Sequence, residues 1–459
     1  MPFFVDVEAT RFRGERFPVE STTGPRRAST CPASPVTLGP SPMITSVRLE
    51  GFKNFRDATL HLGPLTVIVG TNASGKSNIR DAFRFLHGMG RGYSLAEIIG
   101  EKYVEGGVLQ WKGIRGGIRE VAFHGESSFQ VTTLMSRDSH ETAKHWIDVG
   151  VRSRKTGPVV NGESLRVGDD VAFETRFSGS SPGIGSLPVW MKKNNVDDHE
   201  YFLAQSLFIS TRTVLEQFRA SMFSNRSDYV RCREFIESLE SMRFLDLSPD
   251  AMKVPSVPGQ VILGDRGENL SSVLQAICND DDTKRAMIEW VRQLTPLDVS
   301  DFDFVPDQQG KVLLTFIEST GRRTSAYSAS DGTLRFLAII AVLMGPDSAK
   351  FYFLEEIDNG IHPTRLSLLL QLIEQQTKQR GIQVVTTTHS PQLLAMLSPE
   401  ARQHASLVYR LEGSTEAKIT RIVDIPGANE VLETQNLGRL HESGWLENAV
   451  AFAKTAETP

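Results

Sequence analysis

The chain has 459 residues, which is enough for two or three domain-sized bodies with a substantial core. Its composition is ordinary, with 40% hydrophobic and 23% charged residues, and the net charge of −5 gives no global basic signal for nucleic acid or an anionic membrane. The cysteines Cys31, Cys232 and Cys278 show no metal-ligand spacing, which favours a reducing, cytoplasmic setting. No apolar run approaches the ~20 residues of a membrane span, so we expect no membrane insertion.

Residues 1–42 differ in composition from the rest of the chain. They are rich in Pro, Ser, Thr and Arg and show no sustained hydrophobic periodicity. They also lack the apolar core of a signal peptide. We interpret them as a disordered extension or as the product of a mis-called start, since Met43 begins a clean alternating strand.

The next segment predicts a phosphate-binding loop. Strands are expected at 44–49 and 58–62, and the apolar run 65–69 leads into a G-x-x-x-x-G-K-S motif. The helical spacing of 78–86 would place phosphates at a helix N-terminus, with Lys76 on the β/γ-phosphates and the Ser77 hydroxyl on Mg²⁺. The predicted nucleotide-binding residues of this loop are Gly70, Thr71, Asn72, Ala73, Ser74, Gly75, Lys76, Ser77 and Asn78.

The middle of the chain divides into two regions of different periodicity. Strands are expected at 104–109, 118–123, 129–134, 146–152 and 171–177, with a hairpin near 157–162 and a loop at 179–188, and together they predict an antiparallel wing. Helical spacing dominates 197–248 and 269–294 and is interrupted by prolines, without the sustained heptads of a long coiled coil. From 312 onward the pattern alternates helix and strand, with strands at 312–317, 351–354, 382–387 and 406–410 and helices at 334–344, 363–379 and 391–397, which is typical of a parallel sheet.

Three polar motifs accompany this alternation. Glu355 and Glu356 end an apolar strand, and because neighbouring strand residues point in different directions we expect Glu355 in the Mg²⁺ shell and Glu356 as the general base. His389 follows the next apolar strand, where it could sense or stabilise the γ-phosphate. The alternatives are a solvated acidic pair and a structural histidine. Ser330 and Gly332 open an apolar helix, and by themselves they indicate only its start.

The order of these motifs resembles the ABC-type ATPases of the RecF, OLD and SMC clade, in particular the stand-alone bacterial AAA family ATPases without a Toprim domain. The matching sequences are the P-loop, Ser-Asp-Gly-Thr-Leu-Arg at 330–335, Leu-Glu-Glu-Ile-Asp-Asn-Gly-Ile-His-Pro at 354–363 and Thr-His-Ser-Pro at 388–391. The opening Leu-Glu-Gly-Phe-Lys-Asn-Phe at 49–55 is similar to the first strands of that clade. The resemblance covers about 44–91 and 327–410.

In this clade two heads dimerise face to face, and each ATP lies between one P-loop and the partner's signature motif. The resemblance implies that Ser330 and Gly332 contact the partner's nucleotide and that Asp358 lies in a loop that crosses the dimer interface. It also implies that His389 is the switch histidine and that Lys53 lies near the nucleotide. Two details differ from the usual pattern, because Glu355 replaces the commoner aspartate and the signature lacks the full Leu-Ser-Gly-Gly-Gln of transporters. A glutamine ligand to Mg²⁺ is expected in the wing, and Gln110 is a candidate by order only.

The expected fold class is α/β: a P-loop NTPase with an ABC-type head, whose mixed or parallel sheet is flanked by helices, plus an antiparallel β wing and a helical insertion. The predicted domains are the extension at 1–42, the N-terminal half of the head with the P-loop and wing at 43–195, a mainly helical insertion lobe at 196–310, and the C-terminal half at 311–459 with the signature, Walker B strand and switch histidine.

The leading functional hypothesis is a cytoplasmic, ATP-hydrolysing switch that uses Mg²⁺ and forms an ATP-linked homodimer or higher homo-oligomer. It would serve DNA repair or anti-phage defence, beside a separately encoded nuclease or toxin effector. One alternative is an OLD-like ATP-dependent nuclease, which needs a Toprim domain of ~100 residues with clustered carboxylates. Only about 50 residues follow Arg410, and the upstream Asp301-Phe-Asp303 is expected in a turn.

The other alternative is a transporter-type ATP-binding subunit, which the roughly 250 residues between Lys76 and Ser330 disfavour because transporters keep these motifs close. Contact with DNA is left open. The arginines of 212–233 could form a DNA-facing patch or a mixed-charge helix face with interleaved acids. These arginines are Arg212, Arg219, Arg226, Arg231 and Arg233.

Overall fold

A computed structural model describes residues 42–138, 141–151, 157–175, 185–192, 201–219, 227–295, 298–346 and 349–457. The described residues belong to one compact unit, Pro40–Pro459. Residues 1–41 of the predicted extension lie outside the described part of the chain, and the first strand, β1, begins at Met43.

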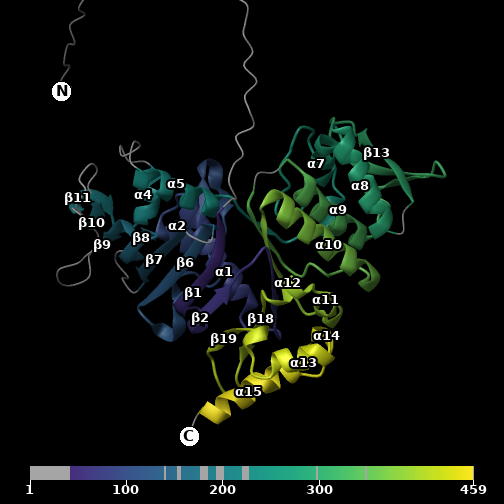
Figure 1. Ribbon diagram of the computed structural model, residues 1–459. Helices are drawn as coiled ribbons and strands as arrows, with labels where there is room; N and C mark the ends of the chain where they lie inside the picture. Colours follow the sequence, from purple (N-terminus) through teal and green to yellow (C-terminus); the bar gives the residue numbers. More distant parts are fainter. Residues whose placement is uncertain are drawn as a thin grey trace, which may run out of the picture. The chain divides into compact units, whose positions relative to one another are not determined.

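The larger sheet is antiparallel and, within the described residues, has the strand order β11-β10-β9-β8-β7-β6-β1-β2. Its strands are β1 (Met43–Phe52), β2 (Phe55–His61), β6 (Ser128–Asp138), β7 (Glu141–Gly150), β8 (Val159–Val167), β9 (Asp170–Thr175), β10 (Ser186–Lys192) and β11 (Tyr201–Ile209). The strands from β6 to β11 pair in sequence order and form the antiparallel wing that the sequence predicts. The helices α4 (Val214–Arg219) and α5 (Ser227–Glu240) lie against the wing strands (Figure 1).

The second sheet carries the P-loop strand near its centre, in the order β12-β16-β17-β3-β18-β19. Its strands are β3 (Leu65–Val69), β12 (Met242–Leu245), β16 (Phe351–Leu354), β17 (Gln383–Thr388), β18 (Ala405–Arg410) and β19 (Ala417–Arg421). All neighbours in it are parallel except β18 and β19. The carboxyl ends of β3, β16 and β17 therefore meet at one edge, which is the edge that binds ligands in such sheets.

Alternate residues of the parallel strands face two separate cores, as expected for strands buried on both faces. Tyr352 and Leu354 of β16 pack in one core with the helices α9 (Asp331–Met344) and α10 (Pro363–Arg380). Phe351 and Phe353 pack in the other, where the ring centroid of Phe83 on α1 (Lys76–Gly90) lies 4.9 Å from that of Phe351. This packing fixes the P-loop helix against the strand that carries the acidic pair.

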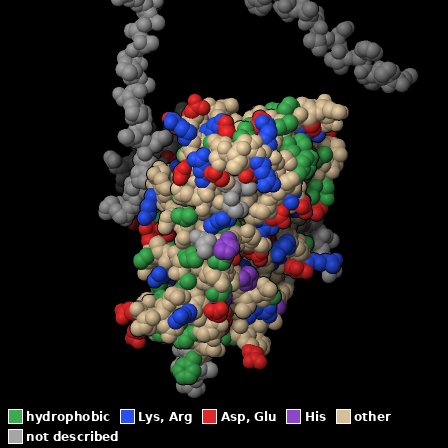
Figure 2. Space-filling view, turned by 90° about the vertical axis from the view of Figure 1, so that its right-hand side faces the viewer, with side chains coloured by type: hydrophobic (Ala, Val, Ile, Leu, Met, Phe, Trp, Pro, Cys, Tyr) green, Lys and Arg blue, Asp and Glu red, His purple; other side chains and the backbone are tan. Residues whose placement is uncertain are grey.

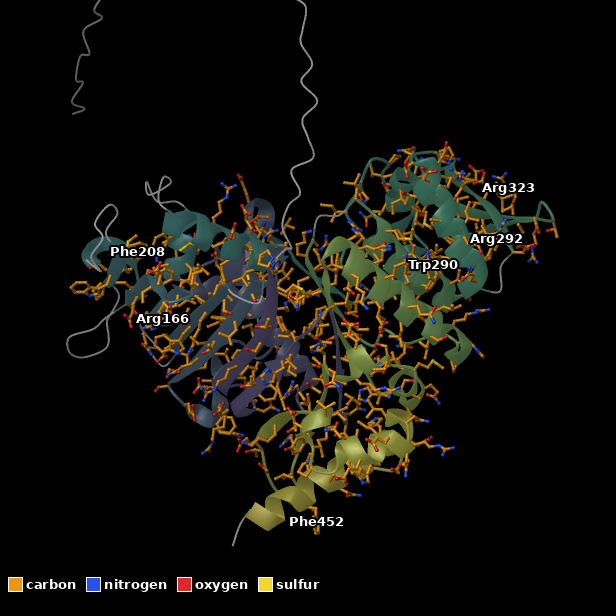
Figure 3. The ribbon with its side chains drawn as sticks, in the orientation of Figure 1. Arg166, Phe208, Trp290, Arg292, Arg323 and Phe452 are labelled. Atoms are coloured by element: carbon orange, nitrogen blue, oxygen red, sulfur yellow. The ribbon has the colours of Figure 1, made fainter. Side chains whose placement is uncertain are left out.

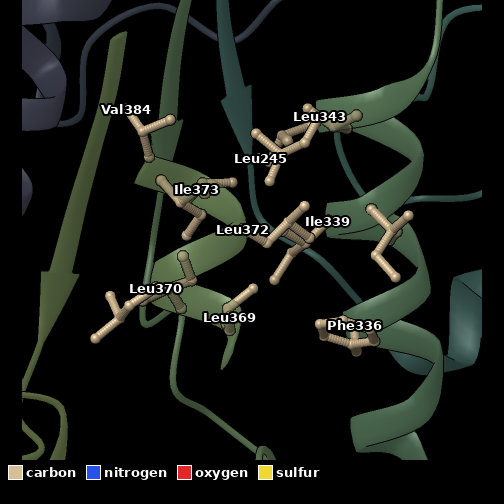
Figure 4. Close-up of a cluster of buried hydrophobic side chains, with 14 of the residues drawn as sticks. Leu245, Phe336, Ile339, Leu343, Leu369, Leu370, Leu372, Ile373 and Val384 are labelled. Atoms are coloured by element: carbon tan, nitrogen blue, oxygen red, sulfur yellow. The ribbon is translucent and has the colours of Figure 1, made fainter. Parts of the chain in front are cut away.

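Leucine and isoleucine side chains join α9 to α10 in the first of these cores. Figure 4 shows Ile339 and Leu343 of α9 facing Leu369 and Leu372 of α10, with Leu245 of β12 beside them. The helix α9 is buried along almost its whole length, which explains its nearly continuous apolar sequence. No helix in the described part of the chain is both long enough and apolar enough to cross a membrane.

The remaining described elements connect these strands and helices or follow the last of them. They are α2 (Leu95–Ile99), β4 (Lys102–Val104), η1 (Glu105–Gly107), β5 (Val108–Trp111), α3 (Gly117–Glu120), η2 (Phe123–Gly125), α6 (Pro249–Met252), α7 (Leu270–Ile277), α8 (Asp281–Leu294), β13 (Val299–Pro306), β14 (Val312–Glu318), β15 (Arg323–Ser325), η3 (Ala326–Ser328), α11 (Pro391–Ala395), α12 (Pro399–Arg402), η4 (Ile422–Asp424), α13 (Ala428–Thr434), α14 (Leu437–Glu442) and α15 (Trp445–Glu457). On the last helix, Phe452 points into solvent (Figure 3).

Five local predictions were wrong. The segment 118–123 is not a strand, because Gly116 and Gly117 at φ +76 and +56 turn the chain into the short helix α3. The segment 104–109 is not one strand, because η1 divides it into the hairpin β4–β5. The segment 201–209 forms strand β11 and not a helix. Residues 186–188 of the expected loop belong to strand β10. Asp301 and Asp303 lie within β13 rather than in a turn, since that segment pairs along β14.

Candidate active site

The P-loop connects the buried strand β3 to helix α1. Gly70 and Gly75 have φ values of +157 and +125. A Cβ atom on Gly70 would lie 2.1 Å from the carbonyl oxygen of Val408, so the loop approaches β18 too closely for any side chain. The backbone N–H groups of Asn78 and Ile79 donate to the carbonyl of Gly75, which starts the helix directly at the loop.

The lysine of the motif folds back onto its own loop. Lys76 Nζ donates to the carbonyl oxygens of Gly70 at 2.6 Å and Thr71 at 2.8 Å, and the side chain is buried. Burial lowers the pKa of Lys76 to about 8, although the nearby charge of Glu356 acts in the opposite direction. The ammonium of Lys76 therefore loses its proton more easily than that of an exposed lysine.

The turn between β1 and β2 supports the loop from outside. Asn54 Nδ2 donates to the carbonyl of Ser74 at 3.3 Å, and Asn78 Nδ2 donates to Asn54 Oδ1 at 2.7 Å. Lys53, at φ +57, donates to the carbonyl of Arg115 and lies 3.7 Å from Asp81. Burial lowers the pKa of Lys53 against the attraction of Asp81. Lys53 therefore contacts Arg115 and Asp81, and it does not line the pocket over the P-loop.

A pocket of about 250 Å³ lies at the carboxyl edge of the parallel sheet, over the P-loop. It brings together three motifs that are far apart in the sequence: the P-loop, the acidic pair after β16 and the histidine after β17. Its lining residues are Asn72, Ala73, Gly75, Lys76, Ser77, Asn78, Arg115, Glu355, Glu356, Thr387 and His389. Of the other predicted loop residues, Gly70 and Thr71 hold Lys76, and Ser74 is buried beneath.

Glu355 is held by a cation from the P-loop helix. Arg80 Nη1 lies 2.9 Å from Glu355 Oε2, and both side chains are about one quarter exposed. The Ser77 hydroxyl and the Glu355 carboxylate line the same pocket, and they are hard oxygen donors of the kind that Mg²⁺ takes in P-loop sites, together with phosphates and water. The donor set present therefore fits Mg²⁺.

Glu356 has a backbone conformation that side-chain-bearing residues rarely adopt. Its φ is +47, its N–H donates to Thr387 Oγ1 at 3.1 Å, and its Oε2 accepts a bond from Asn359 Nδ2 at 3.3 Å. Such backbone strain persists only where the surroundings hold it, and it is concentrated at functional sites. The hydrogen bonds to Thr387 and Asn359 are among the contacts that hold Glu356 in this conformation.

His389 lines the pocket, and the Asp358 carboxyl group lies close enough for its charge to act on the imidazole. Thr388 Oγ1 donates to Asp358 Oδ1 at 2.7 Å, while burial raises the pKa of that carboxyl group above its ordinary value. Burial, followed by the charge of Lys76, lowers the pKa of His389. The neutral imidazole is therefore favoured at neutral pH.

The signature residues do not line the P-loop pocket of their own chain. Ser330 is exposed and caps α9, with its hydroxyl accepting from the N–H of Thr333 at 3.2 Å. Gly332 packs against the loop after β16, where an added Cβ would lie 2.0 Å from the carbonyl oxygen of Gly360. The structure thus brings the signature to the loop that contains Asp358. Gln110 is exposed on β5 and does not line the pocket.

The sequence did not identify two arginines of the site. Arg80 lies one helical turn after Lys76, a spacing that places both on one side of α1 and could have indicated the contact with Glu355. Arg115 lines the pocket and lies 3.1 Å from Asp81 through its Nη2. Arg115 is flanked in the sequence by Gly113, Gly116 and Gly117, and these glycines could have indicated a loop with unusual backbone angles.

A P-loop between a parallel strand and its helix, facing an acidic strand tip and a histidine on the adjacent strand, defines a P-loop ATPase of the ABC type. Comparison with protein families agrees. The chain belongs to the family described as "AAA domain, putative AbiEii toxin, Type IV TA system", whose model matches 65–142 and 239–395, just over half of the chain. This match confirms the resemblance to ABC-type P-loop ATPases that the motifs indicated.

One curated relative is the "ATP/GTP phosphatase" of Helicobacter pylori, which is 23% identical over 182 residues. The match spans 39% of this chain and 46% of that protein, so it covers less than half of the relative's length. Among solved structures, the SMC head domain from Thermotoga maritima has a TM-score of 0.39 at 13% identity and covers 83% of this chain and 99% of its own. An SMC head bound to the C-terminal winged-helix domain of ScpA has a TM-score of 0.45 at 14% identity, with 82% and 97% covered.

Proposed function

We propose that this protein hydrolyses ATP and that ATP closes two copies of it into a dimer, which opens again after hydrolysis. The observation that carries the proposal is that Lys76, Glu356 and His389 line one pocket although they come from three distant segments. A cation for the phosphates and a carboxylate that accepts a proton from water are groups that promote phosphoryl transfer to water, and a neutral imidazole can add a hydrogen bond to the γ-phosphate.

Each side chain has a distinct role in the proposed reaction. Lys76 exchanges the carbonyls of Gly70 and Thr71 for the β/γ-phosphates. Ser77 and Glu355 would hold Mg²⁺, which when bound supplies charge neutralisation at the phosphate oxygens. Glu356 orients the attacking water and accepts its proton, and His389, as a neutral donor, stabilises the charge on the γ-phosphate.

The position of the signature supports a composite site shared by two subunits. Ser330 is exposed at the N-terminus of a 14-residue helix, where backbone N–H groups and the helix dipole favour an anion. This terminus does not line the P-loop pocket of its own chain. A second copy would place Ser330 and Gly332 on the nucleotide held by the first.

The proposed biological role is that of an ATP-timed switch in the cytoplasm, in anti-phage defence or DNA repair, with a separately encoded nuclease or toxin effector. The family description, which names a toxin of a toxin–antitoxin system, supports the defence role. On β13, Asp301 forms an ion pair with Lys284 of α8, and Asp303 forms one with Arg323 of β15. These ion pairs give the two carboxylates a structural use other than nuclease chemistry.

Direct binding of DNA by the protein is a weaker proposal. Arg212 pairs with Glu216 and Arg233 pairs with Glu237, which fits a mixed-charge surface better than a basic patch. The side chains of Arg219, Arg226 and Arg231 lie outside the described part of the structure. On the face drawn in Figure 2, basic and acidic side chains are interspersed as well.

The decisive variant is Glu356→Gln, which keeps the size of the side chain but removes the base. We expect ATP hydrolysis to fall by about 10²–10⁴-fold. The variant should also accumulate as an ATP-bound dimer in light-scattering chromatography with ATP and Mg²⁺. Glu289→Gln, an exposed change on α8, is the matched control. Hydrolysis by Glu356→Gln at the wild-type rate would refute the assignment of the base.

A further inference from the structure

Glu355 and Glu356 also line a second cavity, of about 180 Å³, which the proposed reaction does not use. Its walls are the end of β12, the second and third turns of α9 and the segment that follows β16. Arg335, Asn359 and Glu356 all contribute to it. The cavity therefore places the signature helix next to the proposed base of the same chain.

Two hydrogen bonds connect these three residues in order. Arg335 Nη1 donates to the backbone carbonyl of Asn359 at 3.2 Å, and Asn359 Nδ2 donates to Glu356 Oε2 at 3.3 Å. The backbone N–H of Asn359 also donates to the carbonyl of Glu356 at 2.9 Å, which closes a tight turn. Asn359 is thus held on one side by α9 and holds the carboxylate on the other.

The geometry assigns Arg335 the role of a positioning residue for Glu356. The Arg335 guanidinium fixes the turn at Asn359, and the Asn359 amide fixes one oxygen of Glu356, which leaves the other oxygen to orient water. The inference rests on the proposed function, in which Glu356 is the base. A free carboxylate at a strained backbone position would sample several rotamers. The contacts that run from Arg335 through Asn359 to Glu356, which we call the relay, therefore supply the pre-organisation that a general base needs.

The relay has a consequence for how the two proposed nucleotide sites communicate. Ser330 and Gly332, proposed to contact the partner's ATP, begin the same helix that carries Arg335 five residues later. A rigid helix transmits a shift at its first turn to its second turn. Engagement of the partner's nucleotide by α9 would therefore adjust the base that acts on the chain's own nucleotide.

Arg335→Ala separates this role from direct nucleotide binding. We expect kcat for ATP hydrolysis to fall about tenfold, the size expected when a hydrogen bond to a charged group is lost, with KM for ATP unchanged. The ATP-bound dimer should live longer than in the wild type, because closure is intact and hydrolysis is slow. Asn359→Ala should give the same result, and the double variant should be no slower than either single one.

Two further variants complete the experiment. Arg335→Lys keeps a cationic donor and should recover part of the lost kcat, which a general packing defect would not allow. Arg323→Ala removes an exposed arginine that pairs with Asp303 on a distant hairpin (Figure 3) and should leave kcat unchanged. Thermal unfolding of each variant with and without ATP verifies that it is folded.

Three results would overturn the relay: an unchanged kcat in Arg335→Ala, loss of ATP-driven dimerisation in that variant, or multiplicative losses in the double variant. Failure of the proposed function looks different, because it would appear as wild-type hydrolysis in Glu356→Gln. If Glu356→Gln traps the dimer while Arg335→Ala behaves as wild type, only the relay is wrong.

Discussion

Lys76 Nζ lies 2.6 Å from the carbonyl oxygen of Gly70, so the lysine proposed to bind phosphates is hydrogen-bonded to its own loop. Bound phosphates would replace that carbonyl and the carbonyl of Thr71 as partners. The exchange costs two hydrogen bonds to neutral carbonyls and gains bonds to ionised phosphate oxygens, which are stronger because both partners are charged. It also couples nucleotide binding to the protonation of the lysine.

ATP affinity should therefore decrease above pH 8. Burial lowers the pKa of Lys76 to about 8 in the free protein, whereas phosphates favour the charged ammonium and raise it in the complex. Between these two pKa values ATP binding takes up a proton, so affinity should fall by about tenfold per pH unit above 8. Titrations with a fluorescent ATP analogue at pH 7, 8 and 9 measure this slope. Lys76→Arg, which stays charged, should show a flat profile; the same slope in both proteins would contradict the prediction.

Removal of Arg80 should weaken the binding of Mg²⁺ without abolishing ATP binding. The ion pair at 2.9 Å orients the Glu355 carboxylate, and loss of such an outer partner costs roughly 10–100-fold in metal affinity at other sites. Arg80→Ala should need at least about tenfold more Mg²⁺ for half-maximal ATPase activity. Arg91→Ala, exposed at the end of the same helix, is the control. Identical Mg²⁺ curves for Arg80→Ala and the wild type would show that Arg80 does not orient this carboxylate.

Arg115 should contribute to nucleotide affinity through its charge. It lines the pocket, and Asp81 anchors it at 3.1 Å while most of the side chain remains accessible. Arg115→Ala should weaken ATP binding by about tenfold, comparable to the loss of one charge-assisted hydrogen bond, and the loss should shrink in high salt. Arg119→Ala, exposed on α3, should bind normally. Equal ATP dissociation constants for the two variants would exclude this role.

A methyl group at Gly332 should destabilise the protein. The Cβ atom would lie 2.0 Å from the carbonyl oxygen of Gly360, which is backbone and cannot swing away. Overpacking of this kind costs about 1–3 kcal/mol, so Gly332→Ala should lower the urea midpoint clearly. At Gly185 no atom lies within 4 Å of the corresponding position, and Gly185→Ala should unfold as the wild type does. Equal midpoints for both variants would show that the loop moves freely.

Periodicity in the sequence was sufficient to predict the elements that carry the site. The predicted strand 351–354 coincides with β16, and the P-loop, α9 and β17 lie where the apolar patterns placed them. These segments are buried on one or both faces, so their patterns reflect the core directly. The P-loop, the acidic pair and His389 could be grouped because the carboxyl ends of parallel strands share one edge.

The contacts of the polar side chains could not be predicted in the same way. The contact of Arg80 with Glu355 depends on the packing of α1, and the position of Arg115 at the pocket depends on the loop after β5. The segment 118–123 alternates like a strand, but the glycines before it and the bond from the Val121 N–H to the Gly117 carbonyl make it helical. The segment 201–209 pairs with β10, a strand that was itself not predicted. Local pattern alone does not contain these tertiary constraints.

The central position of β3 also determines when the pocket can form during synthesis. Both neighbours of this strand, β17 and β18, are translated more than 300 residues after it, and the Gln383 side chain bonds to the backbone of Ile44 across a separation of 339 residues. At roughly 5–20 residues per second, a ribosome needs on the order of 15–60 s to deliver them. During that interval the nascent P-loop strand exposes two unpaired edges, and they stay unpaired until β17 and β18 emerge.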